Sequence, residues 1–138
     1  MIIIACVDND MGMSFNNRRL STDKVVTKRI IDLISNKKIW INNFSKDLFE
    51  DYNLDNLIID DEFVNKMGKY DYCFIENISP DKIENKADKI IIYNWNRKYP
   101  ADLYFNINLD NWILEKETDF IGNSHDKITQ KIYIRGEK

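Results

Sequence analysis

Short apolar runs, each about as long as a strand, recur along the first two thirds of the chain. The run at residues 2–7 is continuous and rich in β-branched side chains, which predicts a central strand covered on both faces. A stripe at helical spacing predicts a helix from Asp23 to Asn36, and Ser21 or Thr22 is suited to cap it. This stripe consists of Val26, Ile30, Leu33 and Ile34. Further strands are predicted at residues 38–41, 57–59, 72–75 and 89–93, and short helices after Ser45, at 62–67 and from Ser79-Pro80.

This alternation of strands and helices implies parallel strands joined by crossovers. The last third differs, because the strand-like runs 112–120 and 128–135 are joined through Gly122 with no helix between them. That pattern predicts an antiparallel hairpin at one side of the sheet. We therefore expect one α/β domain over residues 1–138, with three layers and a mixed, mostly parallel central sheet that ends in a C-terminal antiparallel hairpin.

Composition narrows the class of protein. The chain has 138 residues, 43% of them hydrophobic, which suffices for the core of one domain. Its net charge is −3 with Lys and Arg spread along the sequence, which argues against a nucleic-acid partner. No apolar run approaches the ~20 residues of a membrane helix, so we expect a cytoplasmic protein without a membrane partner. Cys6 and Cys73 lie within strands and are expected to be buried, reduced thiols.

Motifs for phosphate and metal binding are sparse. The four glycines are isolated from one another, so there is no glycine-rich loop to cradle a phosphate. His125 is the single histidine, it lies in a polar turn, and it is expected to be a surface or hairpin residue. Residues 8–19 are polar and without a period, which predicts a long loop. No metal site is predicted.

Several motifs, taken in order along the chain, resemble the dihydrofolate reductase family. They are the first strand with Asp8, the segment 12–20, the pair Ala87-Asp88 before a strand, Asp102, the group Asp110-Asn111-Trp112, and residues 132–135. The resemblance covers most of the chain and implies the dihydrofolate reductase fold. It also implies that Gly12, Met13, Ser14 and Phe15 belong to a mobile active-site loop.

The same resemblance shows three departures at the positions that hold NADPH in the family. Glu76-Asn77 stands where the family has a glycine pair against the diphosphate. Residues 42–45 read Asn-Asn-Phe-Ser in place of Gly-Arg-Lys-Thr, and most of the adenine-side segment is missing between Phe49 and Leu57. A carboxylate about 4 Å from a phosphate costs on the order of several kcal/mol. We therefore expect no cofactor, and NADPH in particular is not expected to bind in the family's manner.

Ligands in open α/β sheets gather at the carboxyl ends of the strands, which predicts a crevice for a small molecule there. The residues expected to line it are Asp23, Trp40, Ile75, Glu76, Asn77 and Tyr93.

Three of these residues have two interpretations each. Asp23 is the nearest candidate for the family's pterin-gripping acid, although a gapless match places Val26 there, and it is equally suited to the first turn of a helix. Trp40 is either a core aromatic or a wall of the cavity. Tyr93 replaces a Thr of the family and either fills the pocket or packs in the core.

Three functions follow as hypotheses. The first is a reductase-like protein that has lost NADPH and keeps a reshaped cavity for a pterin-like molecule, without enzymatic activity. The second is a divergent oxidoreductase. The third is an RNA-related protein, because the chain resembles a short bacterial branch of this fold whose members often carry the name ribonuclease Z. The zinc ribonuclease of that name uses a His-x-His-x-Asp-His cluster, which one histidine cannot supply. The residues favour the first hypothesis.

Overall fold

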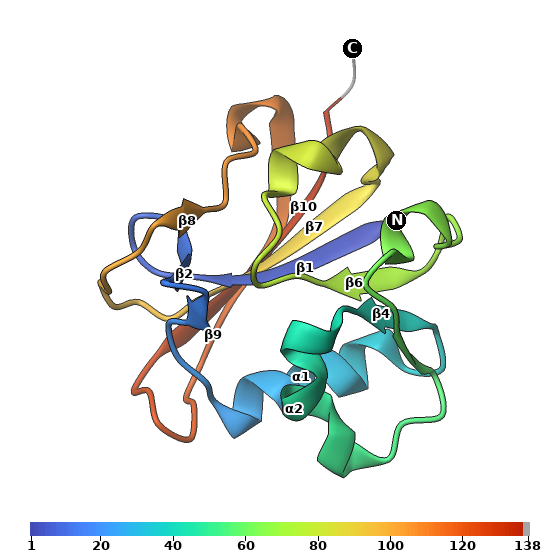
Figure 1. The fold of residues 1–138 in the computed structure, drawn as a ribbon. Coiled ribbons are helices and arrows are strands. Elements are labelled where there is room, and N and C mark those ends of the chain that lie inside the picture. The colour runs from blue at the N-terminus through green and yellow to red at the C-terminus, as the bar shows by residue number, and fades with distance from the viewer. Residues whose placement is uncertain (137–138) are drawn as a thin grey trace.

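The computed structural model describes residues 1–136, and its centre is a seven-stranded mixed sheet (Figure 1). The strands lie in the order β5-β4-β6-β1-β7-β10-β9. Their bounds are β1 Ile2–Val7, β4 Ile39–Ile41, β5 Leu57–Ile59, β6 Tyr72–Phe74, β7 Lys89–Asn94, β9 Trp112–Phe120 and β10 Ile128–Arg135.

Strand direction within this sheet follows the sequence pattern. β1 is an inner strand that pairs in parallel with β6 and β7, and Ile4 lies opposite both Phe74 and Ile91. β10 is antiparallel to β7 and to β9, with a register shift between Ile132 and Tyr133. The predicted fold class is confirmed: an α/β protein with a mixed, mostly parallel central sheet and a C-terminal antiparallel hairpin.

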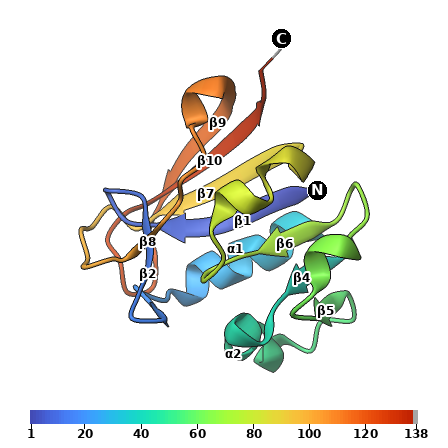
Figure 2. The ribbon, with the colours of Figure 1, turned by 45° about the horizontal axis from the view of Figure 1, so that its top comes forward.

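Helix α1, Lys24–Ile34, is the principal helix on one side of the sheet (Figure 2). Its N-cap is Asp23, whose carboxylate accepts the Val25 N–H, so the cap lies one or two residues later than predicted. The helix ends where Ser35 takes a positive φ of 54°, one residue before Asn36. Its apolar face packs on the sheet, and the short helix α2, Lys46–Phe49, adds Phe49 to the same core.

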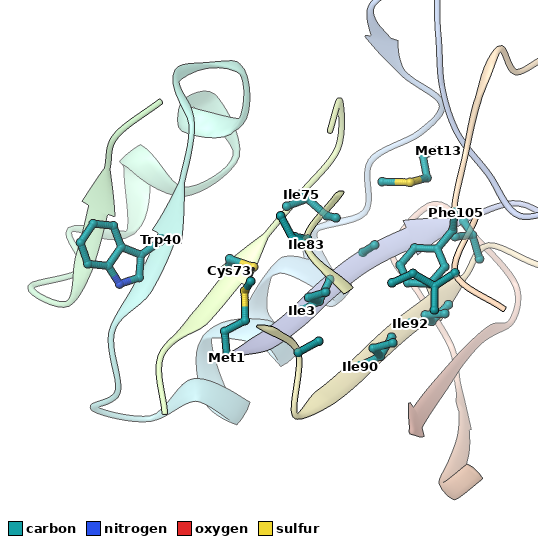
Figure 3. Close-up of a cluster of buried hydrophobic side chains, with 14 of the residues drawn as sticks. Met1, Ile3, Met13, Trp40, Cys73, Ile75, Ile83, Ile90, Ile92 and Phe105 are labelled. Carbon is teal, nitrogen blue, oxygen red and sulfur yellow. Dashed lines mark hydrogen bonds between the residues drawn. The ribbon is translucent and has the colours of Figure 1, made fainter. Parts of the chain in front are cut away.

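The opposite side of the sheet carries a second core, covered by loops and single 3₁₀ turns (Figure 3). Helices were predicted at residues 62–67 and from Ser79-Pro80, and both are wrong in extent, since each segment forms only 3₁₀ turns. A short segment gains too few hydrogen bonds to offset helix nucleation, so the third layer remains a set of turns. The 3₁₀ helices of the chain are Asn43–Ser45, Glu50–Tyr52, Phe63–Asn65, Pro80–Lys82, Glu84–Lys86 and Leu109–Asn111.

The segment predicted as a long loop contains two strands. β2, Gly12–Phe15, and β3, Arg18–Arg19, form a small antiparallel sheet with β8, Leu103–Tyr104, in the order β3-β2-β8. The candidate mobile loop is therefore strand β2, with Met13 and Ser14 buried and Phe15 exposed. The residues here do not alternate between polar and apolar in a way that would predict a strand. Strand β2 instead depends on pairing with β8, which lies about 90 residues away along the chain.

Asp8 fixes the turn that leads into this small sheet. Its buried carboxylate accepts the N–H groups of Asp10 and Gly12 on one oxygen and that of Tyr99 on the other. Gly12 is required at this point, because a Cβ there would lie 2.6 Å from the Cβ of Ala101. Within residues 1–136, no helix combines the length and apolarity needed to cross a bilayer.

Candidate functional site

A cavity lies at the carboxyl ends of β1, β6 and β7, under the first turns of α1. Its volume is about 20 Å³, which is room for about one or two waters. The cavity is thus narrow and needs side-chain movement to admit anything larger. Its apolar wall consists of Met13, Leu20, Val26, Ile30, Leu48, Phe49, Phe74 and Trp95.

Arg19 is the cation in the cavity wall, and it forms two bidentate ion pairs. Its guanidinium donates to both oxygens of Glu76 at 2.8 and 3.0 Å and to both oxygens of Asp47 at 2.8 and 2.9 Å. Nη2, the nitrogen that lies within hydrogen-bond distance of both carboxylates, also lies 3.1 Å from the carbonyl oxygen of Phe44. The hydrogen bond to Glu76 raises the pKa of Arg19, and the bond to Asp47 adds to this increase; burial acts in the opposite direction but does not outweigh them. The bond to Arg19 in turn lowers the pKa of Asp47.

Glu76 lies just after β6 and is buried. Besides the bonds from Arg19, its carboxylate accepts a hydrogen bond from the hydroxyl of Ser45 at 2.7 Å. Ser45 is the N-cap residue of α2, as its place before that helix predicted, but its side chain donates to Glu76 and does not cap the helix backbone.

The two cysteines differ in their place relative to the cavity. Burial, reinforced by the nearby Glu76, raises the pKa of the Cys6 thiol, which lies on the cavity wall. Cys6 and Cys73 are both free; Cys6 is only partly buried, contrary to expectation, whereas Cys73 is fully buried, and burial raises its pKa to about 12.

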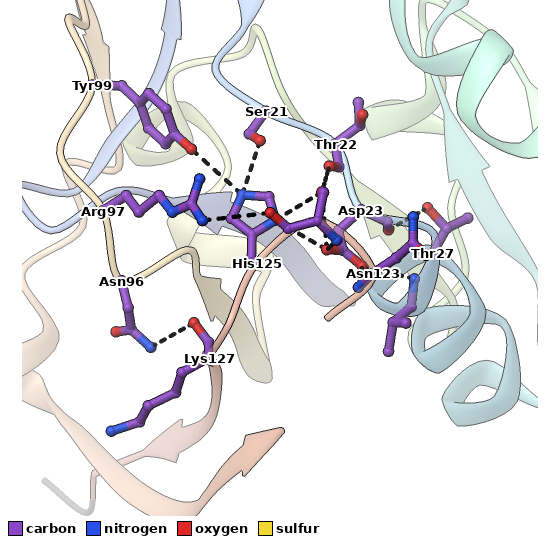
Figure 4. A network of polar contacts seen from close by, with 12 residues as sticks. Ser21, Thr22, Asp23, Thr27, Asn96, Arg97, Tyr99, Asn123, His125 and Lys127 are labelled. Carbon is purple, nitrogen blue, oxygen red and sulfur yellow. Dashed lines mark hydrogen bonds and ion pairs between the residues drawn. The ribbon is translucent and has the colours of Figure 1, made fainter. Parts of the chain in front are cut away.

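At the other end of the cavity, Ser21, His125 and Asp23 form a chain of hydrogen bonds (Figure 4). Ser21 Oγ lies 3.0 Å from Nε2 of His125, and Nδ1 of His125 lies 3.0 Å from Oδ2 of Asp23. The imidazole stacks on Trp95, with ring centres 4.6 Å apart and planes 23° apart. His125 lies in the turn of the β9–β10 hairpin, which is one of the two predicted places, but it is 4% exposed and is not a surface residue.

The carboxylate of Asp23 is saturated with donors. Oδ1 accepts the N–H groups of Val25 and Asn123, and Oδ2 accepts the N–H and hydroxyl of Ser124 and contacts His125. Burial alone would raise the pKa of Asp23, but these hydrogen bonds outweigh it and hold the pKa well below its usual range. Asp23 is therefore ionised and has no free lone pair directed at a ligand.

Comparison with known proteins adds a structural relationship and no sequence relationship. No family model matches the sequence, and no curated protein is similar to it in sequence. The structure is similar to that of dihydrofolate reductase from Enterococcus faecalis complexed with NADP(H) and RAB-propyl. The TM-score is 0.70, the identity is 10%, and the match covers 99% of this chain and 96% of that chain. This chain has a dihydrofolate reductase-like fold.

Within the dihydrofolate reductase-like fold, the residues predicted for the crevice divide between the two faces of the sheet. Asp23 and Glu76 line the cavity. Trp40 and Ile75 belong to the core on the opposite face, and Asn77 and Tyr93 also lie outside the lining, so the six predicted residues do not form one crevice. Side chains alternate between faces along a strand, and Trp40 points away from α1 and donates its indole N–H to Asp71 at 2.9 Å.

Tyr93 and Asn77 are near the cavity but outside its lining. Tyr93 is fully buried in the core beneath α1, against Phe120, where burial raises its pKa. It therefore packs in the core and does not fill the pocket. The side-chain oxygen of Asn77 accepts a hydrogen bond from Asn42 at 2.8 Å.

Three residues of the site were missed from the sequence: Arg19, Ser21 and His125. Arg19 is 57 residues from Glu76, and Ser21 is 104 residues from His125, so no local spacing relates them. The available signal was chemical: a Ser-x-Asp sequence at a helix start, and one histidine in a hairpin that the reductase-like topology brings close to it. Among residues 1–136, no group of three or more His, Cys, Asp or Glu side chains is arranged to hold a metal ion.

Proposed function

We propose that this protein uses the dihydrofolate reductase-like fold without NADPH chemistry, and that it binds a small, mostly apolar molecule in the cavity beneath α1. The observation that supports this most directly is Glu76. Its carboxylate occupies the end of β6, where the resemblance expects bare glycine backbone against a diphosphate, and Arg19 and Ser45 hold it in place.

The charge of Glu76 disfavours a dinucleotide at this strand end. At an effective dielectric of ~20, a carboxylate about 4 Å from a phosphate oxygen is repelled by about 4 kcal/mol. Arg19 does not cancel this repulsion for a ligand, because its guanidinium is shared between Glu76 and Asp47. The residues present do not fit the diphosphate of NADPH.

A second carboxylate supports the same proposal. The resemblance places a nucleotide phosphate at the helix start after the second strand of the parallel set, which here is residues 42–45. The carboxylate of Asp61 already accepts the backbone N–H of Asn43 at 2.9 Å and its side-chain amide at 3.1 Å. These bonds hold the pKa of Asp61 below its usual range. The carboxylate of Asp61 thus uses the N–H groups that a bound phosphate would otherwise need.

The lining of the cavity indicates the chemistry of its ligand. Both acids in the wall, Asp23 and Glu76, are paired within the protein. A pterin-like ligand would need a free carboxylate and would have to release Glu76 from Arg19. A small molecule with an apolar body needs only the rotation of side chains such as Leu48, because most of the wall is apolar.

Calorimetric titration of NADPH tests the cofactor part of the proposal. The wild type is expected to give no heat of binding at micromolar NADPH. The double variant Glu76→Gly/Asn77→Gly removes the carboxylate, and binding by it alone would identify these two residues as the block. Micromolar binding by the wild type would contradict the proposal and favour the divergent oxidoreductase.

A thermal-shift panel of folates, flavins, small aromatic molecules, NADPH and short RNAs tests the ligand part. A ligand of the native state raises the melting temperature. The shift from a cavity ligand is expected to disappear in Val26→Phe, which fills the cavity, and to persist in Val25→Phe, whose side chain does not line it. A shift with RNA alone would favour the third hypothesis, and a shift that survives Val26→Phe would place the ligand elsewhere.

A further inference from the structure

We propose that Ser21 and His125, with Asp23 as a positioning residue, form a nucleophile that hydrolyses esters of small apolar acids. The distances match this arrangement, with 3.0 Å between Ser21 Oγ and His125 Nε2 and 3.0 Å between His125 Nδ1 and Asp23 Oδ2. A hydroxyl hydrogen-bonded to a base, and a base oriented by a third group, is the geometry of an activated serine. The inference rests on the proposed cavity, which would receive the acyl group.

The surroundings of Asp23 set the tautomer of His125. Asp23 is ionised and fixed by three backbone N–H groups, so it can only accept, and Nδ1 of His125 must carry the proton between them. Nε2 is then the acceptor for the hydroxyl of Ser21, which is the direction of proton transfer that a nucleophile needs. Stacking on Trp95 fixes the plane of the ring.

His125 and Asp23 are more deeply buried than Ser21, as expected for a nucleophile that must reach a substrate while its base stays shielded from water. The side chains of His125 and Asp23 are 2% and 0% exposed, so the hydrogen bond between them is shielded from water. Ser21 is half-buried and lines the cavity. The nucleophile thus faces the space where a ligand would lie, and the charged partner lies behind it.

A purely structural role is the alternative interpretation of this network. Bonds from Asn123 and Ser124 to Asp23 already tie the hairpin to the start of α1, and they do not involve Ser21. Tyr99 also approaches Nε2, at 3.4 Å, which is longer than the contact from Ser21. The Ser21 hydrogen bond is therefore additional to what the hairpin needs for its attachment.

The proposed reaction consumes one ester and one water. Ser21 Oγ attacks the carbonyl carbon while its proton passes to Nε2 of His125, and the electron pair of the C=O bond moves to oxygen. The tetrahedral intermediate then breaks its C–O bond to the alcohol, which leaves with the proton from His125. Water, deprotonated by His125, attacks the acyl-Ser21, releases the carboxylic acid and restores the hydroxyl.

The size and lining of the cavity define the substrate class. The space is narrow, and the wall beside Ser21 includes Val26 and Ile30. Acetyl and butyryl groups are therefore the acyl chains that fit with least rearrangement. The p-nitrophenyl esters of these two acids are the probes of choice, because their leaving group is coloured and remains outside the cavity.

The experiment combines covalent labelling with ester hydrolysis by the intact protein. The wild type is incubated with a fluorophosphonate, and the modified residue is located by mass spectrometry. We expect one adduct, on Ser21. Hydrolysis of p-nitrophenyl acetate should fall about 100-fold or more in Ser21→Ala and in His125→Gln, and should not change in Ser79→Ala, a serine that does not line the cavity and donates to Asp81. Asp23→Asn should lower kcat and leave KM unchanged, because Asp23 acts on the base and not on the ester.

Labelling of the wild type does not depend on whether any variant folds. No adduct on Ser21, or adducts shared equally with Ser79, would overturn the inference, as would unchanged hydrolysis by a folded Ser21→Ala. The outcome is separable from that of the proposed function. Labelling of Ser21 in a protein that also binds NADPH would contradict the cofactor proposal alone, and a cavity ligand without labelling would contradict the esterase alone.

Discussion

At the residue scale, the carboxylate of Asp23 receives hydrogen bonds from two segments about 100 residues apart along the chain. One segment is the first turn of α1, and the other is the turn between β9 and β10 that carries His125. An ionised acid held by several N–H groups stabilises the fold only while it is charged. Asp23 should therefore set part of the acid stability of the protein.

The variant Asp23→Asn tests this contribution. The folded pKa of Asp23 lies below its unfolded value of about 3.9, so the unfolded chain takes up the proton first as the pH falls. The stabilisation by the carboxylate is complete above about pH 5 and decreases as the pH falls through 4 towards the folded pKa. We expect the variant to be less stable than the wild type by about 1–3 kcal/mol at pH 7, and this difference to shrink at pH 3.

Urea unfolding at both pH values measures the difference. Asp126→Asn, which alters an exposed acid of the same turn, is the matched control and should follow the wild type at both pH values. A gap between Asp23→Asn and the wild type that stays constant from pH 7 to pH 3 would contradict the assignment.

Gly122 is the second residue on which the network depends. A Cβ at this position would lie 2.4 Å from Oδ2 of Asp23 and 2.7 Å from the Cδ1 of Ile128. Gly122→Ala should therefore push the carboxylate out of its hydrogen bonds and destabilise the protein by about 1–3 kcal/mol. Gly68→Ala is the control, because its new Cβ would meet only the carboxylate of Asp71, at 3.2 Å. Chemical unfolding of both variants decides the matter, and equal stabilities would show that the turn adapts freely.

Residue by residue, the sequence predicted the acids of the site better than their partners. Asp23 and Glu76 were identifiable because each stands at the end of a recognisable element, a helix start and a strand end. Arg19 and His125 were not, because what places them in the candidate site is a contact with a residue more than 50 positions away. Tertiary contacts of that kind leave no periodicity in the sequence.

At the scale of elements, Arg19 joins three of them: it lies on β3 and pairs with Asp47 on α2 and with Glu76 after β6. The Glu76 side chain is only 8% exposed, so removing its partner leaves a buried charge without its counterion. Arg19→Met should cost about 3 kcal/mol, and the double variant Arg19→Met/Glu76→Gln should recover most of that loss. A double-mutant cycle by urea unfolding measures the coupling.

The exposed pair between Lys98 and Asp10 is the control for that cycle. Its side chains are 78% and 56% exposed, and Lys98→Met should change the stability by less than about 1 kcal/mol. If Arg19→Met were equally harmless, the ion pairs would not hold β3 against α2 and β6.

The elements of the fold were predictable to different degrees. The strands that make up the parallel core were placed within one or two residues, because continuous β-branched runs such as residues 2–7 and 89–93 have few alternative structures. The third layer was not, because a capping acid such as Asp60 is equally compatible with a helix and with one 3₁₀ turn. The length of chain available between two strands decides between them.

At the scale of the whole molecule, the sheet separates two cores that share no side chains. Ile30 lies in the core beneath α1, which contains Trp95. Ile83 lies in the core on the other face, which contains Trp40 and Trp112. If residues 1–138 form one cooperative domain, Ile30→Val and Ile83→Val should each cost about 0.5–1.5 kcal/mol and add within about 0.5 kcal/mol.

Unfolding followed by tryptophan fluorescence and by circular dichroism tests that cooperativity. The two signals should give one coincident transition in the wild type and in both variants. Separate midpoints, with each variant moving only one of them, would show that the two faces of the sheet unfold independently.

The order of strands in the sheet has a consequence for synthesis on the ribosome. β1 is made first, but its neighbours are β6 and β7, so its first partner residue is Tyr72. At about 5–20 residues per second, a nascent chain carries this unpaired apolar segment for about 4–14 seconds before a neighbour exists. During that interval residues 2–7 form an exposed six-residue segment of high β-propensity, which is the kind of segment that aggregates through β-pairing. The acidic residues Asp8 and Asp10, which follow it directly, are the nearest charges that oppose such aggregation.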